Sequence, residues 1–439
     1  MASRTTIARH LAASLLAGGW SEAALQSRIQ KIFGRRTRAA QRHLRTDILD
    51  AATTLYPPSP STLVRIILAS PAFAKAAASL LKESSPPPAI LTPPAFAPAS
   101  AFAGLDVPQI ATTGDLAGFL NLSIGRLDWL ADSRQQHRRA DLVALQNYSY
   151  TFIPKRSGQP RLIESPKPQL REIQRRILRE ILNAAPVHDR AHGFVRGRSC
   201  LSSAQLHAGE CVVVAVDLKH FFTSVGTPRI HGLFRSIGYP WAAARLLTGL
   251  CTTATPLSVL TQPDVGCDWE TRKLFNAPHL PQGAPTSPAL ANLCAWTLDQ
   301  RLAALGSYFG ANYSRYADDI AFSGDRAFAR QVGRFLAGVE TVIADEGFVL
   351  NNSKTRIMQA SGRQRITGIV VNDHVNIDRN SYDRLKATLH NCLVHGASEQ
   401  NRDGLPDFRT HLNGRVGWVE QVSPNRGMRL REMFDRIVW

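Results

Sequence analysis

The chain has few cysteines, no long apolar run and no evident internal repeat. Its six cysteines, spread over 439 residues, include no C-x-x-C pair. This spacing argues against a disulfide-stapled secreted domain and favours free thiols in a reducing cytoplasm. No apolar stretch reaches the roughly 18 residues that a membrane-spanning helix needs, so we expect no membrane segment.

Acidic residues are also scarce. The chain has 34 Asp and Glu against 52 Lys and Arg, a formal net charge of +18. The excess is uneven: residues 151–200 hold 11 basic and 4 acidic residues, and residues 1–50 hold 9 and 3. Such a distribution predicts a polyanionic partner that binds with strong salt dependence.

Two adjacent aspartates stand out against this basic background, in the run Tyr316-Ala317-Asp318-Asp319. Like charges repel, and burial among the apolar, strand-forming residues around them makes ionisation harder still. A bound hard cation such as Mg²⁺ would offset that cost and would bring phosphates with it. Taken alone, an Asp pair also fits an ordinary Asx-capped turn.

A third carboxylate lies upstream. Residues 211–216 form a continuous apolar, β-branched run, typical of a strand buried on both faces, and we expect it to end at Asp217. Residues 311–316 and 320–322 predict a β-hairpin around the Asp pair. If the two strands are neighbours, the three carboxylates converge as in two-metal phosphoryl transfer. The alternative is a strand-ending Asp that caps a turn.

The segment 280–288 combines a loop with a helix start. Ser287 suits the N-cap and Pro288 the first helical position, which predicts a helix to about Leu305 with Gly306 just beyond it. In the preceding loop, Gly283 would let the backbone approach a ligand closely.

These segments together resemble the palm motifs of reverse transcriptases, in the order Asp217-x-x-x-Phe221-Phe222, residues 281–283, residues 316–319 and Lys354. Further segments are similar to the family's fingers hairpin, the helix after it and a bacterial glycine-rich signature: 152–161, 171–181 and 191–199. Within the family the chain resembles the bacterial retron-type enzymes. Residues 366–372 are similar to their "VTG" segment, and 203–207 to their "NAxxH" element, with Ser203 in place of Asn. The likeness covers roughly residues 140–439.

The resemblance implies an α+β right-hand polymerase fold, with fingers, a palm built on an antiparallel sheet, a helical thumb and an α-helical N-terminal extension. We expect a basic Ala-rich helical region at 1–82, with helices near 5–17, 21–33, 36–55 and 60–82. A Pro-rich linker at 83–100, with six prolines in 18 residues, should follow. The remaining parts are a helical segment packing on the fingers (101–146, helical at 110–132 and 138–146), fingers and palm (147–375) and thumb (376–439).

The resemblance also implies roles at the active site. Asp217, Asp318 and Asp319 would be catalytic and, with the Leu218 carbonyl, would bind two Mg²⁺ ions, for which Mn²⁺ could substitute. Lys354 would donate a proton to pyrophosphate, unless it is a solvated loop lysine. The residues expected at the incoming deoxynucleotide are Lys155 and Arg161 on its triphosphate, Phe222 as a gate against the ribose 2′-hydroxyl, and Gln282 and Gly283 at the sugar and primer terminus.

Contacts with nucleic acid are expected from residues of the signature segments and of the thumb, namely Arg196, Arg198, His207, Thr367, Gly368, Arg415, Arg426 and Arg429. In the thumb, the amphipathic pattern predicts core positions for Trp418, Met428, Leu430 and Phe434, with Arg431 also left to meet phosphate.

The function implied is an RNA-directed DNA polymerase of a retron. A cognate structured non-coding RNA would be template and primer, and synthesis from an RNA 2′-hydroxyl would yield branched single-stranded DNA (msDNA). Its partners would be this RNA, deoxynucleotides, the RNA/DNA hybrid and product, and an effector or toxin protein of a phage-defence system. The alternatives are a different defence-associated or group II intron-like reverse transcriptase, and a catalytically idle RNA-binding scaffold.

Overall fold

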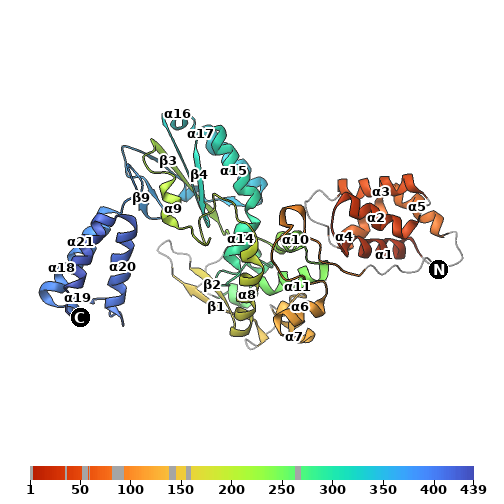
Figure 1. Ribbon diagram of the computed structural model, residues 1–439, viewed down its shortest axis with the longest axis horizontal. Coiled ribbons are helices and arrows are strands. Elements are labelled where there is room, and N and C mark those ends of the chain that lie inside the picture. The colour runs from red at the N-terminus through yellow and green to blue at the C-terminus, as the bar shows by residue number, and fades with distance from the viewer. Residues whose placement is uncertain are drawn as a thin grey trace. The chain divides into compact units, whose positions relative to one another are not determined.

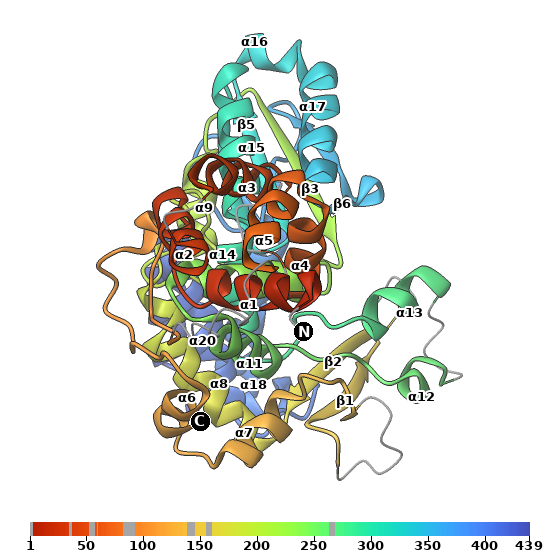
Figure 2. The same cartoon turned by 90° about the vertical axis from the view of Figure 1, so that its right-hand side faces the viewer.

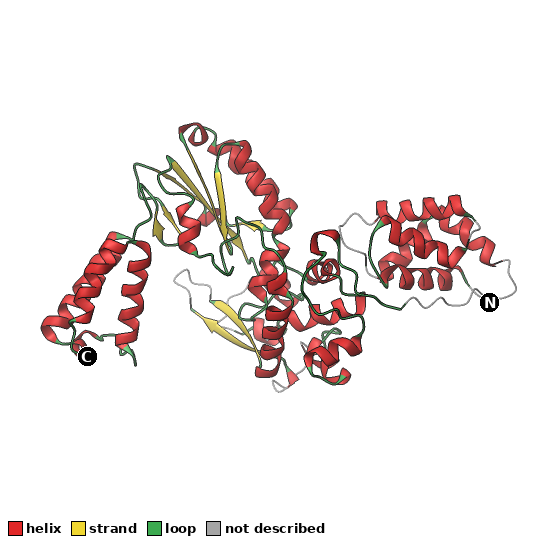
Figure 3. Cartoon of the chain, viewed as in Figure 1, coloured by secondary structure: helices red, strands yellow, loops and turns green. Residues whose placement is uncertain are grey.

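The computed structural model describes residues 3–34, 37–51, 58, 60–81, 93–137, 145–154, 160–262 and 268–439. The chain forms two compact units, one of residues 1–186 with 222–294 and one of residues 187–221 with 295–439. Helices dominate the described residues, and the strands are confined to a few small antiparallel sheets (Figure 3).

The first unit begins with a bundle of five helices, which we call the N-terminal bundle (Figure 1). Its helices are α1 (Arg4–Leu16), α2 (Glu22–Phe33), α3 (Arg38–Ala51), α4 (Pro60–Ala69) and α5 (Pro71–Leu81). The hydroxyls of Ser3 and Ser21 cap α1 and α2 by accepting backbone hydrogen bonds. The apolar stripes of the five helices bury one core, which includes Leu11, Leu15, Leu25, Ile29, Leu44, Ile67 and Phe73.

The predicted single helix at 60–82 is wrong, because it is two helices that meet at Ser70 with a bend of 86°. Pro71 lacks the amide hydrogen that a continuous helix would need there. Among the described residues, no single helix is long and apolar enough to cross a membrane. Only the bent pair α4 and α5, counted together, has the necessary length and composition.

Part of the predicted Pro-rich linker packs against the first unit, although residues 82–92 lie outside the described residues. The amides of Ala97 and Ala99 donate to the carbonyls of Gly238 and Ser236 at 2.8 and 2.9 Å. The Phe96 ring stacks edge-on against Tyr239. The short helix η1 (Ser100–Phe102) follows.

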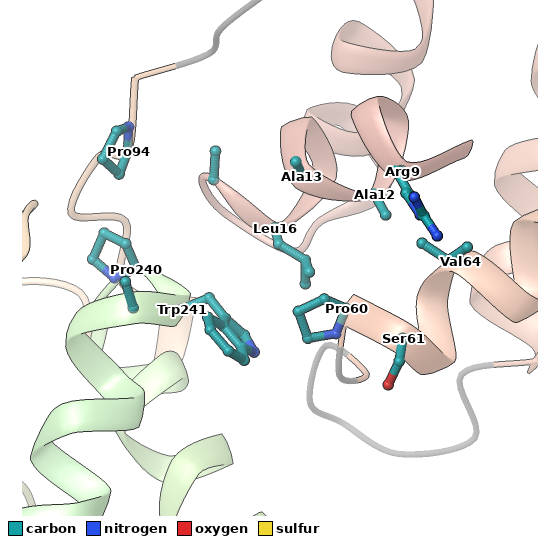
Figure 4. A pocket seen from close by; sticks show the side chains of 12 residues that line it. Arg9, Ala12, Ala13, Leu16, Pro60, Ser61, Val64, Pro94, Pro240 and Trp241 are labelled. Carbon is teal, nitrogen blue, oxygen red and sulfur yellow. The ribbon is translucent and has the colours of Figure 1, made fainter. Parts of the chain in front are cut away.

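A pocket of about 610 Å³ lies between the N-terminal bundle and the residues around Pro94 and Trp241 of the same unit (Figure 4). Arg9 and Leu16 of α1 and Val64 of α4 face Pro94 and Trp241 across it. The lining is mostly apolar, and the Trp241 ring also packs on the bundle core.

The predicted helical run 110–132 consists of α6 (Thr113–Leu120) and α7 (Ile124–Ala131), separated by Asn121 in the left-handed conformation (φ 55°). Thr112 and Asp115 form a reciprocal capping box at the start of α6. Of the segment 138–146, residues 138–144 lie outside the described residues.

The rest of the first unit surrounds the hairpin of β1 (Tyr148–Ile153) and β2 (Arg161–Pro166). Leu162 of β2 shares a small core with Leu260 and Phe275, so α12 and α13 lie beside the hairpin (Figure 2). The helices are α8 (Pro168–Glu180), η4 (Leu182–Ala184), α10 (Thr227–Ile237), α11 (Trp241–Cys251), α12 (Leu257–Leu260), α13 (Trp269–Asn276) and α14 (Ser287–Cys294).

The second unit is built on an antiparallel sheet in the order β4-β5-β3-β6, with β7 also paired to β3. Its strands are β3 (Val212–Lys219), β4 (Asn312–Tyr316), β5 (Asp319–Gly324), β6 (Val349–Leu350) and β7 (Arg356–Gln359). Its helices are α9 (Cys200–Gln205), α15 (Trp296–Tyr308), α16 (Arg326–Ala329), α17 (Val332–Asp345) and η6 (Asn352–Lys354).

The two faces of the sheet carry different neighbours, because successive strand residues point to opposite sides. On one face, the ring of Phe322 stacks on Tyr313 and on Phe335 of α17, and α15 lies beside β4 (Figure 1). On the other face, Val213 and Ala321 pack with Ala204 of α9.

Two predicted element ends are wrong. The strand expected to end at Asp217 continues through Lys219, since its last residues pair with β6. The helix expected at 288–305 is divided at Ala295 into α14 and α15, and Gly306 lies inside α15 rather than after it. The predicted hairpin around the Asp pair is confirmed.

The C-terminal part of the second unit is helical, as predicted, after the short hairpin of β8 (Arg365–Ile366) and β9 (Ile369–Val370). Its helices are α18 (Arg379–His395), α19 (Ala397–Gln400), α20 (Phe408–Val422) and α21 (Pro424–Asp435). Leu430 and Phe434 are core residues, but Trp418 and Met428 are 37% and 57% exposed, so their predicted core positions are wrong.

Candidate active site

The register of the sheet brings the three predicted carboxylates to one end of it. Asp217 of β3 is the direct partner of Asp319 of β5, and Asp318 lies in the tight turn between β4 and β5. The amide of Leu218 donates to the Asp318 carbonyl at 3.0 Å, which ties the turn to β3. The turn is made possible by Ala317, whose φ of 57° is left-handed.

Both carboxylate oxygens of Asp217 already have partners. Asn351 donates its side-chain amide to Oδ1, and the Lys354 ammonium lies on Oδ2, each at 2.8 Å. Partial burial opposes the charge of Lys354, but its hydrogen bond to Asp217 and the nearby aspartates outweigh this and raise its pKa. Lys354 is therefore a cation held at the carboxylates rather than a freely solvated loop lysine.

Asp319 carries uncompensated negative charge. Burial, followed by the charges of Asp318 and Asp217, raises the pKa of Asp319 to about 6, and Lys354 offsets only part of this. A carboxylate that resists ionisation beside two other carboxylates is chemically suited to bind a hard cation that prefers oxygen ligands.

The carboxylates are not gathered into a preformed cage, however. In the described parts of the chain, no three acidic, histidine or cysteine side chains are grouped closely enough to hold a metal ion. Asp217 is instead engaged with Asn351 and Lys354. The donor chemistry fits Mg²⁺, and ion binding would require Asp217 to exchange one of these partners.

A cleft of about 930 Å³ opens on the face of the sheet that carries Asp217 and Asp319. Its wall is basic, with Arg356, Arg363 and Arg365 beside Lys354, so it can accept the phosphates of a nucleic acid or nucleotide.

The predicted residues Thr367 and Gly368 line the same cleft at the β8–β9 turn. Both have positive φ, 46° and 91°, which is unusual for a β-branched threonine. The Thr367 hydroxyl is buried without a hydrogen-bond partner. Strain and an unsatisfied hydroxyl beside a cleft favour a binding role over a purely structural one.

The glycine-rich segment predicted at 191–199 lies against the turn of Ala317 and Asp318 between β4 and β5, which we call the catalytic turn after its predicted role. The amide of His192 donates to the Arg315 carbonyl at 2.7 Å, and the Phe194 ring contacts the Tyr316 ring. Gly193 is so close that a Cβ there would stand 2.6 Å from the Ala317 nitrogen. Only glycine permits this approach.

The loop with the predicted residues Gln282 and Gly283 is held in the first unit by β2. The Glu164 amide donates to the Gln282 carbonyl at 2.8 Å, and Gly283 has a φ of 132°. The Glu164 side chain is fully buried, and the ring of His279 lies on it at 2.9 Å. The sequence analysis missed this Glu164–His279 pair, because no local pattern links residues so far apart.

Several predicted nucleic-acid contacts differ from expectation. His207 is buried and bonded to Ser314 and Ser323 at 2.8 Å each, so its predicted contact is wrong. Burial lowers the pKa of His207 to about 3 and keeps the ring neutral. Arg198 donates to the carbonyls of His188 and Ala191, so its main contacts hold its own loop, whereas Arg196 is exposed.

In the C-terminal helices, Arg429 is exposed and Arg415 is half-buried. Arg426 donates to Asn376 and lies over the Tyr382 ring. Arg431 forms a bidentate ion pair with Glu420, and its predicted contact with phosphate stays a prediction.

Of the remaining predicted residues, the three that the structure describes lie at or near the ends of strands. Phe221 is buried after β3 and stacks on Phe348, as expected for a core ring, and Phe222 is half-buried. Arg161 is exposed at the start of β2, and Lys155 lies outside the described residues.

Comparison with known proteins decides the family. The sequence profile described as "Reverse transcriptase (RNA-dependent DNA polymerase)" matches residues 153–374. The chain is 37% identical over 328 residues to the retron Mx65 reverse transcriptase of Myxococcus xanthus, covering 74% of this chain and 71% of that protein. The chain belongs to the retron-type reverse transcriptases.

Two further relatives agree. The retron Mx162 reverse transcriptase of Myxococcus xanthus is 37% identical over 71% of this chain and 64% of its own length. The retron Ec86 reverse transcriptase of Escherichia coli is 30% identical over 64% of this chain and 79% of its own. As a retron-type reverse transcriptase, the chain has the reverse transcriptase polymerase fold and is an RNA-directed DNA polymerase, in a family that generally uses divalent metal ions. The idle-scaffold alternative is thereby set aside.

Proposed function

We propose that this reverse transcriptase copies a cognate structured non-coding RNA into msDNA, starting from a 2′-hydroxyl of that RNA, as part of an anti-phage retron with an effector protein. The observation that carries the proposal is the convergence of Asp217, Asp318 and Asp319 beside a basic cleft, in a chain 37% identical to two retron enzymes.

We assign the fingers, palm and thumb to the residue ranges expected from the sequence. The β1–β2 hairpin and α8 act as fingers, the sheet β3–β7 as palm, and α18–α21 as thumb. The N-terminal bundle, residues 1–82, carries 12 basic and 3 acidic residues, half of the net charge of +18. It is therefore a candidate for contact with the RNA.

Asp217, Asp318, Asp319 and the Leu218 carbonyl would hold two Mg²⁺ ions, or Mn²⁺ in their place. When bound, the ions activate the attacking hydroxyl and stabilise the leaving pyrophosphate. Asn351 orients the Asp217 carboxylate through its 2.8 Å hydrogen bond. Lys354, whose ammonium donates to the same carboxylate, would pass a proton to the leaving pyrophosphate.

The remaining proposed roles concern binding of the nucleotide and of nucleic acid. Lys155 and Arg161 hold the triphosphate, Phe222 excludes a 2′-hydroxyl, and Gln282 and Gly283 meet the sugar and primer terminus. Arg196, Thr367, Gly368, Arg415, Arg426 and Arg429 remain proposed contacts to template, primer or hybrid. The five described cysteines are free thiols, which supports a cytoplasmic setting.

The test is to purify the protein from cells carrying its native flanking DNA and to analyse the co-purified nucleic acid. The matched control is Asp318→Asn with Asp319→Asn. We expect a discrete single-stranded DNA that shifts on RNase or debranching treatment and is absent from the control. Unbranched DNA, or DNA made only on added template and primer, would instead indicate a different defence-associated or intron-like reverse transcriptase.

A further inference from the structure

Directly beneath the catalytic turn, the second unit buries an ion pair that the sequence analysis did not anticipate. The side chains of Arg315 on β4 and Asp299 on α15 are both 0% exposed. Arg315 donates from Nε to Oδ1 at 2.7 Å and from Nη2 to Oδ2 at 2.6 Å, a bidentate geometry. The Tyr313 hydroxyl adds a hydrogen bond to the same carboxylate at 2.6 Å.

The remaining guanidinium nitrogen points to the catalytic turn. Nη1 of Arg315 donates to the carbonyl of Ala317 at 3.1 Å. Ala317 is the left-handed residue of the turn, and its carbonyl belongs to the peptide bond that joins it to Asp318. The orientation of that peptide sets the direction in which the Asp318 side chain leaves the turn.

Stability alone does not account for this arrangement. The free-energy cost of removing two charges from water is about equal to the free energy gained from their attraction. Replacing a buried ion pair by apolar residues is therefore often neutral or stabilising. A lysine could balance Asp299, but its single ammonium could not provide three donors in a planar fork. What the arginine adds is a rigid link from α15 to the turn. The Phe221 ring lies under the guanidinium carbon at 5.4 Å and adds a further contact.

We propose that Arg315 is a positioning residue for polymerisation. Anchored by Asp299, it holds the Ala317 carbonyl and thereby sets the direction of Asp318 and Asp319 for the catalytic ions. The inference rests on the proposed role of these two aspartates. It assigns Asp299 the supporting role of orienting the guanidinium.

The main test is the double variant Arg315→Met with Asp299→Leu, which removes both buried charges together. It should unfold at a temperature close to that of the wild type, since no unpaired charge is left. Its kcat for deoxynucleotide incorporation should fall about 10- to 100-fold, because an error of order 1 Å at reacting groups has that effect. The Kd for primer–template should change little.

Mn²⁺ binding, followed by electron paramagnetic resonance without nucleotide, provides a measurement independent of activity. We expect weaker binding in the double variant. Tyr313→Phe is the matched control, since it removes only the hydroxyl contact to Asp299 and leaves the Ala317 bond intact. Its kcat and Mn²⁺ binding should stay near wild type.

If the double variant does not fold, Arg315→Lys decides the question, because it keeps the charge next to Asp299 but loses the fork. A folded variant with wild-type kcat and Mn²⁺ binding, from either design, would overturn the proposal. The Asp318→Asn, Asp319→Asn control distinguishes a failure of the proposed function from a failure of the proposed role of Arg315. If that control still polymerises, the proposed roles of the aspartates fail; if it is inactive while Arg315 variants are unaffected, only the role of Arg315 fails.

Discussion

Gly193→Ala should slow polymerisation through the backbone of the catalytic turn. The added Cβ would stand 2.6 Å from the Ala317 nitrogen and 3.1 Å from the Tyr316 carbonyl carbon, whereas ordinary contact begins at 3.4 Å. Both neighbours are backbone, so neither can rotate away, and the turn or the loop must move by about 0.8 Å. Overpacking of this kind costs about 1–3 kcal/mol, and a shift of order 1 Å at reacting groups lowers kcat about 100-fold.

The assay is single-nucleotide incorporation on a defined primer–template, with kcat, nucleotide KM and primer–template Kd measured separately. Gly333→Ala is the matched control, since Gly333 is an exposed residue of α17 with nothing within 4 Å of its added Cβ. A Gly193→Ala enzyme with unchanged kcat, at saturating substrate and with an unchanged unfolding midpoint, would refute the claim that this loop and the turn are in rigid contact.

Three further predictions concern other parts of the chain. Phe222→Ala should lower the preference for deoxynucleotides over ribonucleotides about 10-fold or more in competition assays; unchanged selectivity would show that Phe222 is not the gate. Burial disfavours the charged ring of His279, but the Glu164 carboxylate outweighs burial and raises the pKa of His279. The pair therefore stabilises the fold fully below the pKa of histidine in the unfolded chain, about 6.5. This stabilisation is lost as the pH rises through the higher pKa of the folded state. The urea midpoint should therefore fall as the pH rises above about 6.5, and His279→Gln should flatten this fall; an equal fall in both proteins would contradict it. Arg38 and Arg42 are exposed and one turn apart on α3. The double variant Arg38→Glu, Arg42→Glu should bind RNA more weakly and should lower the steepness of log binding constant against log salt concentration by about 2. An unchanged slope with a folded bundle would show that this face of α3 does not bind the RNA.

Much of the fold around the site could be predicted from local patterns. The continuous β-branched run before Asp217 and the segments on either side of the Asp pair predict strands, and all three strands are present. Prediction failed at element ends, where pairing partners decide. β3 extends to Lys219 because β6 lies beside it, and no residue near Lys219 indicates that. The break at Ser70 did have a local signal in Pro71.

The three carboxylates of the candidate site could be predicted because each belongs to a short sequence motif. The buried pairs Arg315–Asp299 and Glu164–His279 could not be predicted, since their members meet only through tertiary packing. His207 illustrates the converse error. A histidine in a signature segment of a basic protein suggests contact with nucleic acid, but its partners Ser314 and Ser323 lie on the sheet, and the ring is buried between them and α9.

The backbone bonds between residues 190–192 and Arg315 have a consequence for solubility. β4 is the last strand on its side of the sheet, and such an edge presents unpaired amides and carbonyls to any other extended chain. The amide of Arg315 donates to Arg190 and its carbonyl accepts from His192, so this short parallel bridge closes the edge at its centre. Changes that detach the loop would therefore expose a template for strand addition, and variants in it should aggregate as well as lose activity.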